Sequence, residues 1–220
     1  MKVTHPSGPR SVAEVLAGLG DIPTHRRWLT PTPGTATEAD AEMWNDAVDK
    51  RLVELVDGIL VEKAAGWVES VQIAWLGGKL FEFAEHNDLG VVLGPGGGYR
   101  LKPGLIRLPS CTFVAWADLP SDETPDVTFS DVPPRLAVEF VRRDNSPAEM
   151  TRKVAEYFPA GVKLVWVIDP KRKTATIYTS PTKGTIIDET DTLEGGRVLP
   201  GFRLPLADVF AAGQRKRKKK

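Results

Sequence analysis

The chain has 220 residues, of which 41% are hydrophobic and 26% charged. This composition is typical of a globular protein and excludes a mainly disordered chain. The length suits one well-cored domain with an extension better than two independent domains. No apolar run reaches the roughly 20 residues that a bilayer span needs, the N-terminus lacks the apolar core of a secretion signal, and the single Cys111 allows no intramolecular disulfide. We therefore expect a cytoplasmic protein without a membrane partner.

Positive charge is concentrated at the C-terminus, although the formal net charge is zero. The last six residues (215–220) are all basic. Such a block can neutralise the phosphates of nucleic acid with a salt-dependent affinity, or it can be a disordered solubilising tail. The sequence leaves both interpretations open. It predicts a helical extension (1–49), a core domain (50–210) and a basic tail (211–220).

The first predicted elements are two helices and a hairpin. Ser11 and Glu14 have the spacing of a capping box, so a helix is expected to open there. A second helix is expected over 37–49. Two apolar runs within 52–62 flank an Asp-Gly pair, which is typical of a tight hairpin turn. The core domain is therefore expected to begin with two paired strands.

The middle of the core combines one long helix with extended segments. Apolar residues at helical spacing predict a helix over 68–86, with Val71, Leu80 and Phe83 among the residues of its apolar face. The glycines within 94–98 are followed neither by a Lys-Ser/Thr pair nor by a helix, so a connection between strands is expected there rather than a phosphate-binding loop. An extended segment is expected over 105–114. The next residues, 115–134, are rich in Asp, Pro and Ser and are expected to form a surface loop.

The last part of the core has the pattern of a crossover unit. A strand is predicted over 136–141, a helix from the Ser-Pro-x-Glu start at 146 to about 158, and an apolar strand over 164–168. One more strand is predicted over 174–178. Strand, helix and strand should form a right-handed parallel crossover. The order of elements predicts an α/β fold with a mixed central sheet flanked by helices, and the crossover is where chemistry is expected.

Several short strings occur in an order that resembles the Uma2 family, also known as DUF820. The strings are Glu54–Gly58, Arg107–Pro109, Val138-Glu139, Lys153–Tyr157, Gly161–Pro170 and Leu199–Phe202. Each is weak alone, but their order over roughly 50–210 is specific. The resemblance implies the restriction-endonuclease-like core of the PD-(D/E)XK nucleases. In active members it also implies divalent-metal-dependent cleavage of DNA. A homodimer is also possible, because many nucleases dimerise to cut both strands.

The chemistry of that superfamily explains which residue types matter. Two carboxylates at strand ends hold Mg²⁺, which stabilises charge on the scissile phosphate and lowers the pKa of a bound water, while a lysine assists. By the resemblance, Glu139 matches the acid of the second core strand, and a carboxylate in such an apolar strand is costly to bury without a partner. The simplest pattern has lysine two residues later, where this sequence has Val141. The family resembles members whose lysine lies on the following helix, which points to Lys153.

Residue 110 departs from the family pattern. The motif Arg-x-Pro-Asp-x-x-Phe occurs at 107–113 with Ser110 in place of the first metal-binding Asp. A hydroxyl is a much poorer Mg²⁺ ligand than a carboxylate. Where the family commonly has a small hydroxyl residue after Glu139, this sequence has Arg142 and then Arg143. Arginine repels a metal cation and attracts phosphate, so both departures favour binding over cleavage.

Other carboxylates could supply the missing ligand. Asp126 lies in a second Pro-Asp-x-x-Phe string, 13 residues before Glu139. Glu54 and Glu69, near the start of the core, are further candidates, and Glu54 matches the family string better.

Two functions remain open, beside the third possibility that the fold is as expected but the physiological partner is not DNA. The first is a Mg²⁺-dependent endonuclease in which Glu139 binds the metal, Lys153 assists the water and Ser110 marks the vacant ligand position. The second is a catalytically silent nucleic-acid-binding or regulatory module. That module would use a set of basic residues, namely Arg142, Arg143, Arg152 and the basic tail.

Overall fold

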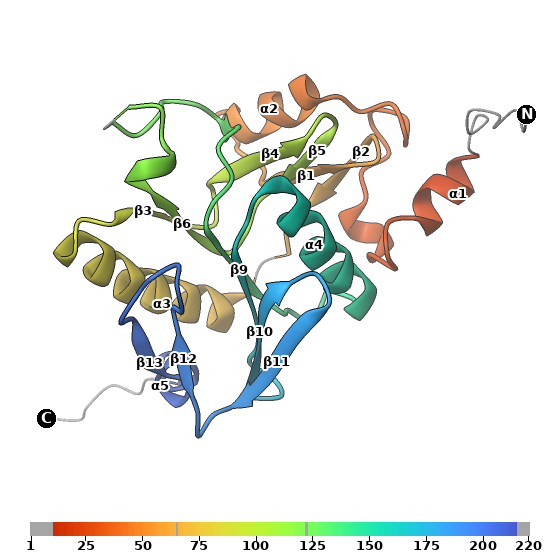
Figure 1. The fold of residues 1–220 in the computed structure, drawn as a ribbon. Coiled ribbons are helices and arrows are strands. Elements are labelled where there is room, and N and C mark those ends of the chain that lie inside the picture. The colour runs from red at the N-terminus through yellow and green to blue at the C-terminus, as the bar shows by residue number, and fades with distance from the viewer. Residues whose placement is uncertain (1–10, 65, 122, 215–220) are drawn as a thin grey trace, which may run out of the picture.

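The computed structural model describes residues 11–64, 66–121 and 123–214 (Figure 1). The described chain forms helices packed on a six-stranded and a five-stranded sheet, with a two-stranded ribbon beside them. The predicted α/β class, with a mixed sheet flanked by helices, is confirmed. A second large sheet was not predicted. In the described segments no helix combines the length and the apolar character needed to cross a bilayer.

The six-stranded sheet is the predicted central sheet. Its strands are β3 (Gly90–Leu93), β6 (Cys111–Ala115), β8 (Leu136–Phe140), β9 (Leu164–Asp169), β10 (Thr174–Ser180) and β11 (Lys183–Asp188), in the spatial order β11-β10-β9-β8-β6-β3. Helix α4 (Pro147–Ala160) joins β8 to β9, which pair in parallel, and the other pairs are antiparallel. The predicted strand, helix and parallel strand are thus confirmed, whereas β11 was missed.

The five-stranded sheet holds the predicted hairpin. Its strands are β1 (Val53–Val56), β2 (Ile59–Glu62), β4 (Gly98–Lys102), β5 (Leu105–Arg107) and β7 (Phe129–Ser130), in the order β2-β1-β5-β4-β7. Asp57 and Gly58 have φ angles of 51° and 72° and form the tight turn between β1 and β2. The extended segment 105–114 is divided, because β5 joins this sheet and β6 the other. The segment 115–134 also contains β7 and is therefore not wholly a loop.

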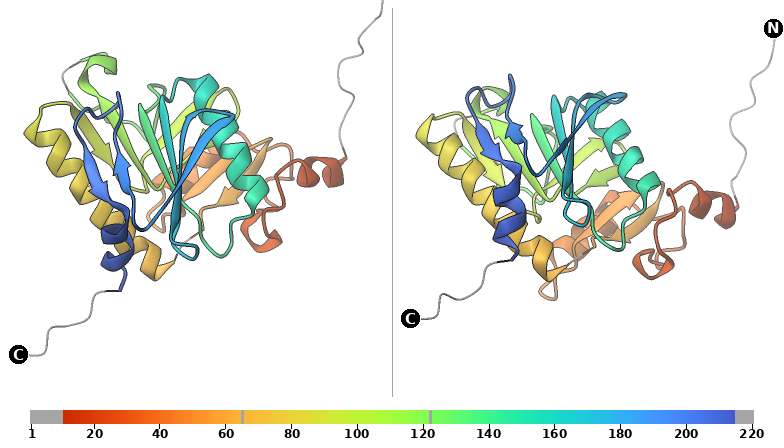
Figure 2. Two further views of the ribbon diagram at one scale, coloured as in Figure 1. Left: turned by 60° about the horizontal axis from the view of Figure 1, so that its bottom comes forward. Right: turned by 90° about the horizontal axis from the view of Figure 1, so that it is seen from below.

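Helices cover both faces of the central sheet (Figure 2). The remaining α-helices are α1 (Val12–Ala17), α2 (Glu38–Asp46), α3 (Trp67–His86) and α5 (Leu206–Ala212). Two short 3-10 turns are η1 (Thr24–Arg26) and η2 (Trp116–Asp118). The two-stranded ribbon consists of β12 (Thr192–Glu194) and β13 (Arg203–Pro205). Buried residues of α3 and α5 pack with one face of the central sheet. Buried residues of α4 pack between the other face and the five-stranded sheet. Helix α4 therefore contacts both sheets.

The described part of the N-terminal extension packs against the core. Val15, Leu19 and Ile22 are buried in the same cluster as α4 and the β1–β2 hairpin. Arg26 forms two hydrogen bonds of 2.9 Å with the two carboxylate oxygens of Glu149 in α4. Residues 11–49 thus share a hydrophobic core with the predicted core domain. Of the predicted basic tail (211–220), residues 211–212 belong to α5, and the six basic residues 215–220 lie outside the described residues.

Candidate functional site

Three predicted site residues meet where the two sheets approach each other. Glu54 lies in β1, Glu139 in β8 and Lys153 in α4. Nζ of Lys153 donates hydrogen bonds to Oε1 of Glu54 at 2.8 Å and to Oε1 of Glu139 at 3.1 Å. Their exposed fractions are 0%, 3% and 3%. One ammonium group therefore bridges two buried carboxylates.

The alternation of strand residues and the period of the helix place these side chains. In β8, Ala137 and Glu139 face α4, because successive strand residues point to opposite faces. Lys153 and Tyr157 are four residues apart and share one face of α4. The hydroxyl of Tyr157 donates to Oε1 of Glu139 at 2.5 Å. Burial and the negative charge of Glu139 raise the pKa of Tyr157 well above its ordinary value, so Tyr157 stays a neutral donor.

Glu54 is held from its other side by Arg107, at the end of β5. A nitrogen of the Arg107 guanidinium lies 2.8 Å from Oε2 of Glu54, and the backbone N–H of Leu108 donates to Oε1 at 3.1 Å. Arg107 also pairs with Glu156 at 2.6 Å. Burial alone would raise the pKa of Glu54, but the positive charges of Lys153 and Arg107 outweigh it and hold that pKa well below its ordinary value. Glu54 is therefore ionised, and both of its oxygens have partners.

Ser110 lies beside Glu139 in the segment that connects the two sheets. Its backbone N–H donates to the carbonyl of Val138 at 2.8 Å. Its hydroxyl oxygen accepts from the backbone N–H of Phe140 at 3.2 Å. Because Val138 and Phe140 flank Glu139, Ser110 is next to the acid, as the family pattern implies. Only 2% of Ser110 is exposed, and its hydroxyl is tied to the backbone of β8.

Lys63 is a member of this cluster that sequence reasoning missed. It follows β2, and its ammonium donates to the carbonyl of Leu108. Burial lowers the pKa of Lys63 to about 8, and the negative charges of Glu139 and Glu54 act in the opposite direction. No sequence motif singled out Lys63. Arg107 and Tyr157, which were also not predicted as site residues, at least lie within the strings that carry the family resemblance.

The family model Uma2, described as "Putative restriction endonuclease", matches residues 43–207 of the chain. The chain belongs to the Uma2 family. A crystal structure from Anabaena variabilis, described as a putative nuclease belonging to DUF820, is similar in fold, with a TM-score of 0.66 and 15% sequence identity over 73% of this chain and 90% of that chain. At this identity the likeness shows the fold alone. A search among curated proteins found no match.

The residues of this buried cluster do not fit a divalent metal. Magnesium prefers several oxygen ligands with negative charge among them, but the position that the family resemblance implies for the first ligand carries the neutral Ser110. The two acids, Glu54 and Glu139, already share the ammonium of Lys153, and Lys63 adds a second ammonium. Within the segments that the structure describes, no three Asp, Glu, His or Cys side chains gather where they could hold a metal ion. The donor set is that of an internally neutralised ion cluster.

The other predicted acids do not complete the site. Asp126 is exposed and lines a pocket to which neither Glu54 nor Glu139 contributes, so the structure does not bring it to Glu139. Glu69 lies in the first turn of α3 and acts electrostatically on Arg142.

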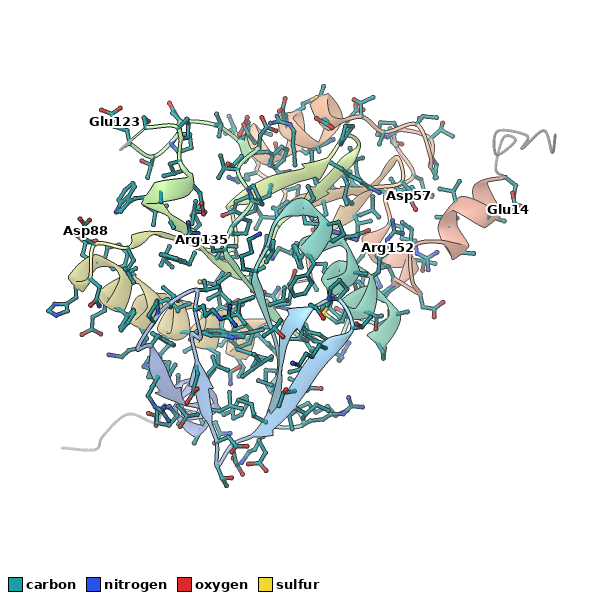
Figure 3. The ribbon with its side chains drawn as sticks, in the orientation of Figure 1. Glu14, Asp57, Asp88, Glu123, Arg135 and Arg152 are labelled. Atoms are coloured by element: carbon teal, nitrogen blue, oxygen red, sulfur yellow. The ribbon has the colours of Figure 1, made fainter. Side chains whose placement is uncertain are left out.

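The three predicted nucleic-acid-binding arginines have different surroundings. Arg152 points toward Asp57 (Figure 3), at 3.1 Å, and also pairs with Glu156 at 2.7 Å. It is therefore occupied within the protein. The side chain of Arg143 is 97% exposed. Arg142 lies between these extremes, because it is partly buried and lines a pocket. Of the three, Arg142 is the one that lines a pocket.

Proposed function

We propose that this chain is a DNA-binding member of the Uma2 family whose buried cluster does not support metal-dependent cleavage. The observation that carries the proposal is the ammonium of Lys153, which bridges Glu54 and Glu139 beside the neutral Ser110. DNA is the expected ligand because the family is described as restriction endonucleases. A homodimer and a cytoplasmic location remain predictions from the sequence.

The charges of the cluster support this proposal. Glu54 and Glu139 carry two negative charges, and Lys153 and Arg107 supply two positive charges within hydrogen-bonding distance. A divalent cation would add two positive charges to a site that is already neutral and dry, and uncompensated buried charge is costly. An Asp at position 110 would add one negative charge and a carboxylate ligand for the metal. Ser110→Asp therefore tests whether an acid at this position permits metal-dependent cleavage.

A second candidate is metal-dependent hydrolysis of DNA. The observation that favours it is the grouping of Glu139, Lys153 and Tyr157 around one carboxylate oxygen, because acid and lysine together are what the family resemblance implies. This candidate requires that a metal displace the Lys153 ammonium from both carboxylates.

The experiment that separates the two candidates is plasmid nicking in Mg²⁺ and in Mn²⁺, beside DNA binding measured by fluorescence anisotropy at low and high salt. The variants are Glu139→Gln and Ser110→Asp, each checked for folding by circular dichroism. We expect the parent protein to bind DNA in a salt-dependent manner and to leave the plasmid intact. Nicking by the parent that Glu139→Gln abolishes would establish the second candidate, and a parent that fails to bind DNA at low salt would refute the first.

A further inference from the structure

A pocket of about 330 Å³ lies between α3 and the loop that follows β3. Its described lining is mostly apolar or glycine, with Cys111 on the wall next to Ser110. Arg142 is the one charged residue in that lining. The pocket therefore joins an apolar space to a single guanidinium group near the buried cluster.

Glycines keep this pocket open. Gly77 and Gly78 are consecutive residues in the interior of α3, where glycine is less favourable than alanine. A Cβ atom at Gly78 would meet no atom within 4 Å, and one at Gly77 would make only an ordinary contact of 3.7 Å with the sulfur of Cys111. Gly94, in the opposite wall, also has open space at its Cβ position. Neighbouring atoms of the protein therefore do not require glycine at these positions, and the lack of side chains leaves the space beside α3 free for a ligand.

The guanidinium of Arg142 forms no hydrogen bond and no close ion pair within the described residues. Its Nε is buried and has no hydrogen-bond acceptor there, and its guanidinium forms no ion pair with a described acid. Burial lowers the pKa of Arg142, while the charges of Glu139 and Glu69 raise it. An arginine remains charged under these conditions. A buried donor without an acceptor is costly, and the oxygens of a phosphate group are the acceptors that match a guanidinium best.

We propose that this pocket binds a single unstacked nucleotide, with the phosphate on Arg142 and the base against the glycine face of α3. The inference rests on the proposed function, because the nucleotide would belong to bound DNA. A volume of about 330 Å³ is at the small end of ligand pockets. Apolar walls suit a base taken out of its stack. Phe81 lines the same pocket and is 54% exposed, so its ring offers a stacking surface to the neighbouring base.

A nucleotide within a strand and a free nucleoside monophosphate share this chemistry. The test therefore measures two probes with the full chain, a fluorescein-labelled single-stranded oligodeoxythymidine and free thymidine monophosphate. Arg142→Gln removes the guanidinium, and Arg143→Gln is its matched control because Arg143 is the adjacent arginine and lies in solvent. Gly78→Leu fills the pocket, and Val71→Leu is its control because Val71 is exposed on the same helix and lies outside the pocket lining. Thermal unfolding verifies that each variant is folded.

We expect Arg142→Gln and Gly78→Leu each to weaken oligonucleotide binding by about tenfold or more, as the loss of a charge-assisted contact or of a stacked base should. Arg143→Gln and Val71→Leu should weaken it by no more than about threefold. The oligonucleotide should bind more tightly than the monophosphate, because a strand makes further contacts.

The nucleotide pocket and the DNA-binding function are tested by different outcomes. Oligonucleotide binding that is unchanged in folded Arg142→Gln and Gly78→Leu proteins would overturn the pocket and leave DNA binding intact. A parent that binds thymidine monophosphate in an Arg142-dependent manner but ignores the oligonucleotide would support the pocket and overturn the DNA-binding function. Binding of neither probe would overturn both.

Discussion

Nζ of Lys153 lies 3.1 Å from Oε1 of Glu139, and the side chains of both residues are only 4% exposed. In such a dry environment either charge is costly once its partner is removed, because it stays buried without compensation. Removing one partner should therefore destabilise the fold, whatever the relation of this contact to DNA. The cluster around it can be examined by unfolding experiments that need no substrate.

Removal of the Lys153 charge should be strongly destabilising. Lys153→Met leaves Glu54 and Glu139 without their shared ammonium, and breaking a buried ion pair typically costs about 3–5 kcal/mol. The free energy of unfolding in urea measures this cost. The Lys153→Met, Glu139→Gln double variant should lose less than the sum of the two single losses, because the residues are in contact. Lys79→Met, which breaks the exposed pair with Glu82, is the control and should change little. An equal effect of both lysine substitutions would refute the prediction.

The contribution of Glu54 should depend on pH. Lys153 and Arg107 hold its pKa in the folded protein below the ordinary value of 4.5. Stability from Glu54 is thus fully present above about pH 4.5 and is lost as the pH falls toward the folded pKa. Glu54→Gln should be clearly less stable than the parent at pH 7, and the gap should narrow below about pH 4.5. Thermal unfolding from pH 3 to 8 tests this, with the surface residue Glu123 (Figure 3) substituted in the same way as control. A gap that does not vary with pH would contradict it.

Docking of the N-terminal segment should depend on Arg26. This residue is 4% exposed and pairs with both oxygens of Glu149, besides donating to the carbonyls of Glu62 and Asp144. Arg26→Met should cost about 3–5 kcal/mol, because it leaves the carboxylate of Glu149 buried without its main partner. Limited proteolysis should then cut faster within 11–35. Arg51→Met, at an exposed ion pair, should leave both the stability and the cleavage rate nearly unchanged. Equal rates of proteolytic cleavage in the Arg26 and Arg51 variants would argue against the prediction.

Gly78→Ala should stabilise the protein. Alanine is favoured over glycine in a helix interior by about 0.8–1 kcal/mol, and the added methyl group meets no atom within 4 Å. The midpoint of urea unfolding should rise without a change in its slope. Gly90→Ala is the contrasting variant, because its Cβ would lie 2.0 Å from the carbonyl oxygen of Val114, and it should be destabilising. A loss of stability in Gly78→Ala would show that the open space is absent in solution.

Short sequence patterns were sufficient to predict several secondary-structure elements. The Asp-Gly turn, the long helix α3 and the β8–α4–β9 unit follow from turn chemistry, periodicity and capping. The apolar face of α3 was predicted less well. Val71 was assigned to it but is 39% exposed, whereas Gln72 is 2% exposed and donates to the carbonyl of Phe210 in α5. A helix from the far end of the chain decides which face is covered, and periodicity within α3 carries no information about it.

The division of 105–114 between two sheets was also beyond local reasoning. The run is apolar on both sides of Leu108–Ser110, so nothing marks the point where the chain leaves one sheet for the other. The family resemblance indicated Glu54, Glu139 and Lys153, which the structure brings together, while their roles stay predictions. Lys63 and Arg107 join them through contacts about 45 to 53 residues apart in sequence. Contacts between elements of such separation are a property of the fold and leave no short motif.

The ion cluster has a consequence for how such sequences evolve. Glu54 and Arg107 belong to one sheet, and Glu139 and Lys153 to the strand-helix unit of the other, so the cluster fastens two halves of the molecule. A lineage in which cleavage no longer brings an advantage could replace an acid at position 110 at little structural cost, but it could not discard the remaining charges one at a time. These residues would persist long after selection for chemistry had ended. In this chain the stability of the fold is therefore sufficient to explain why Glu54, Glu139 and Lys153 are present together, and their presence does not by itself indicate that the chain cuts DNA.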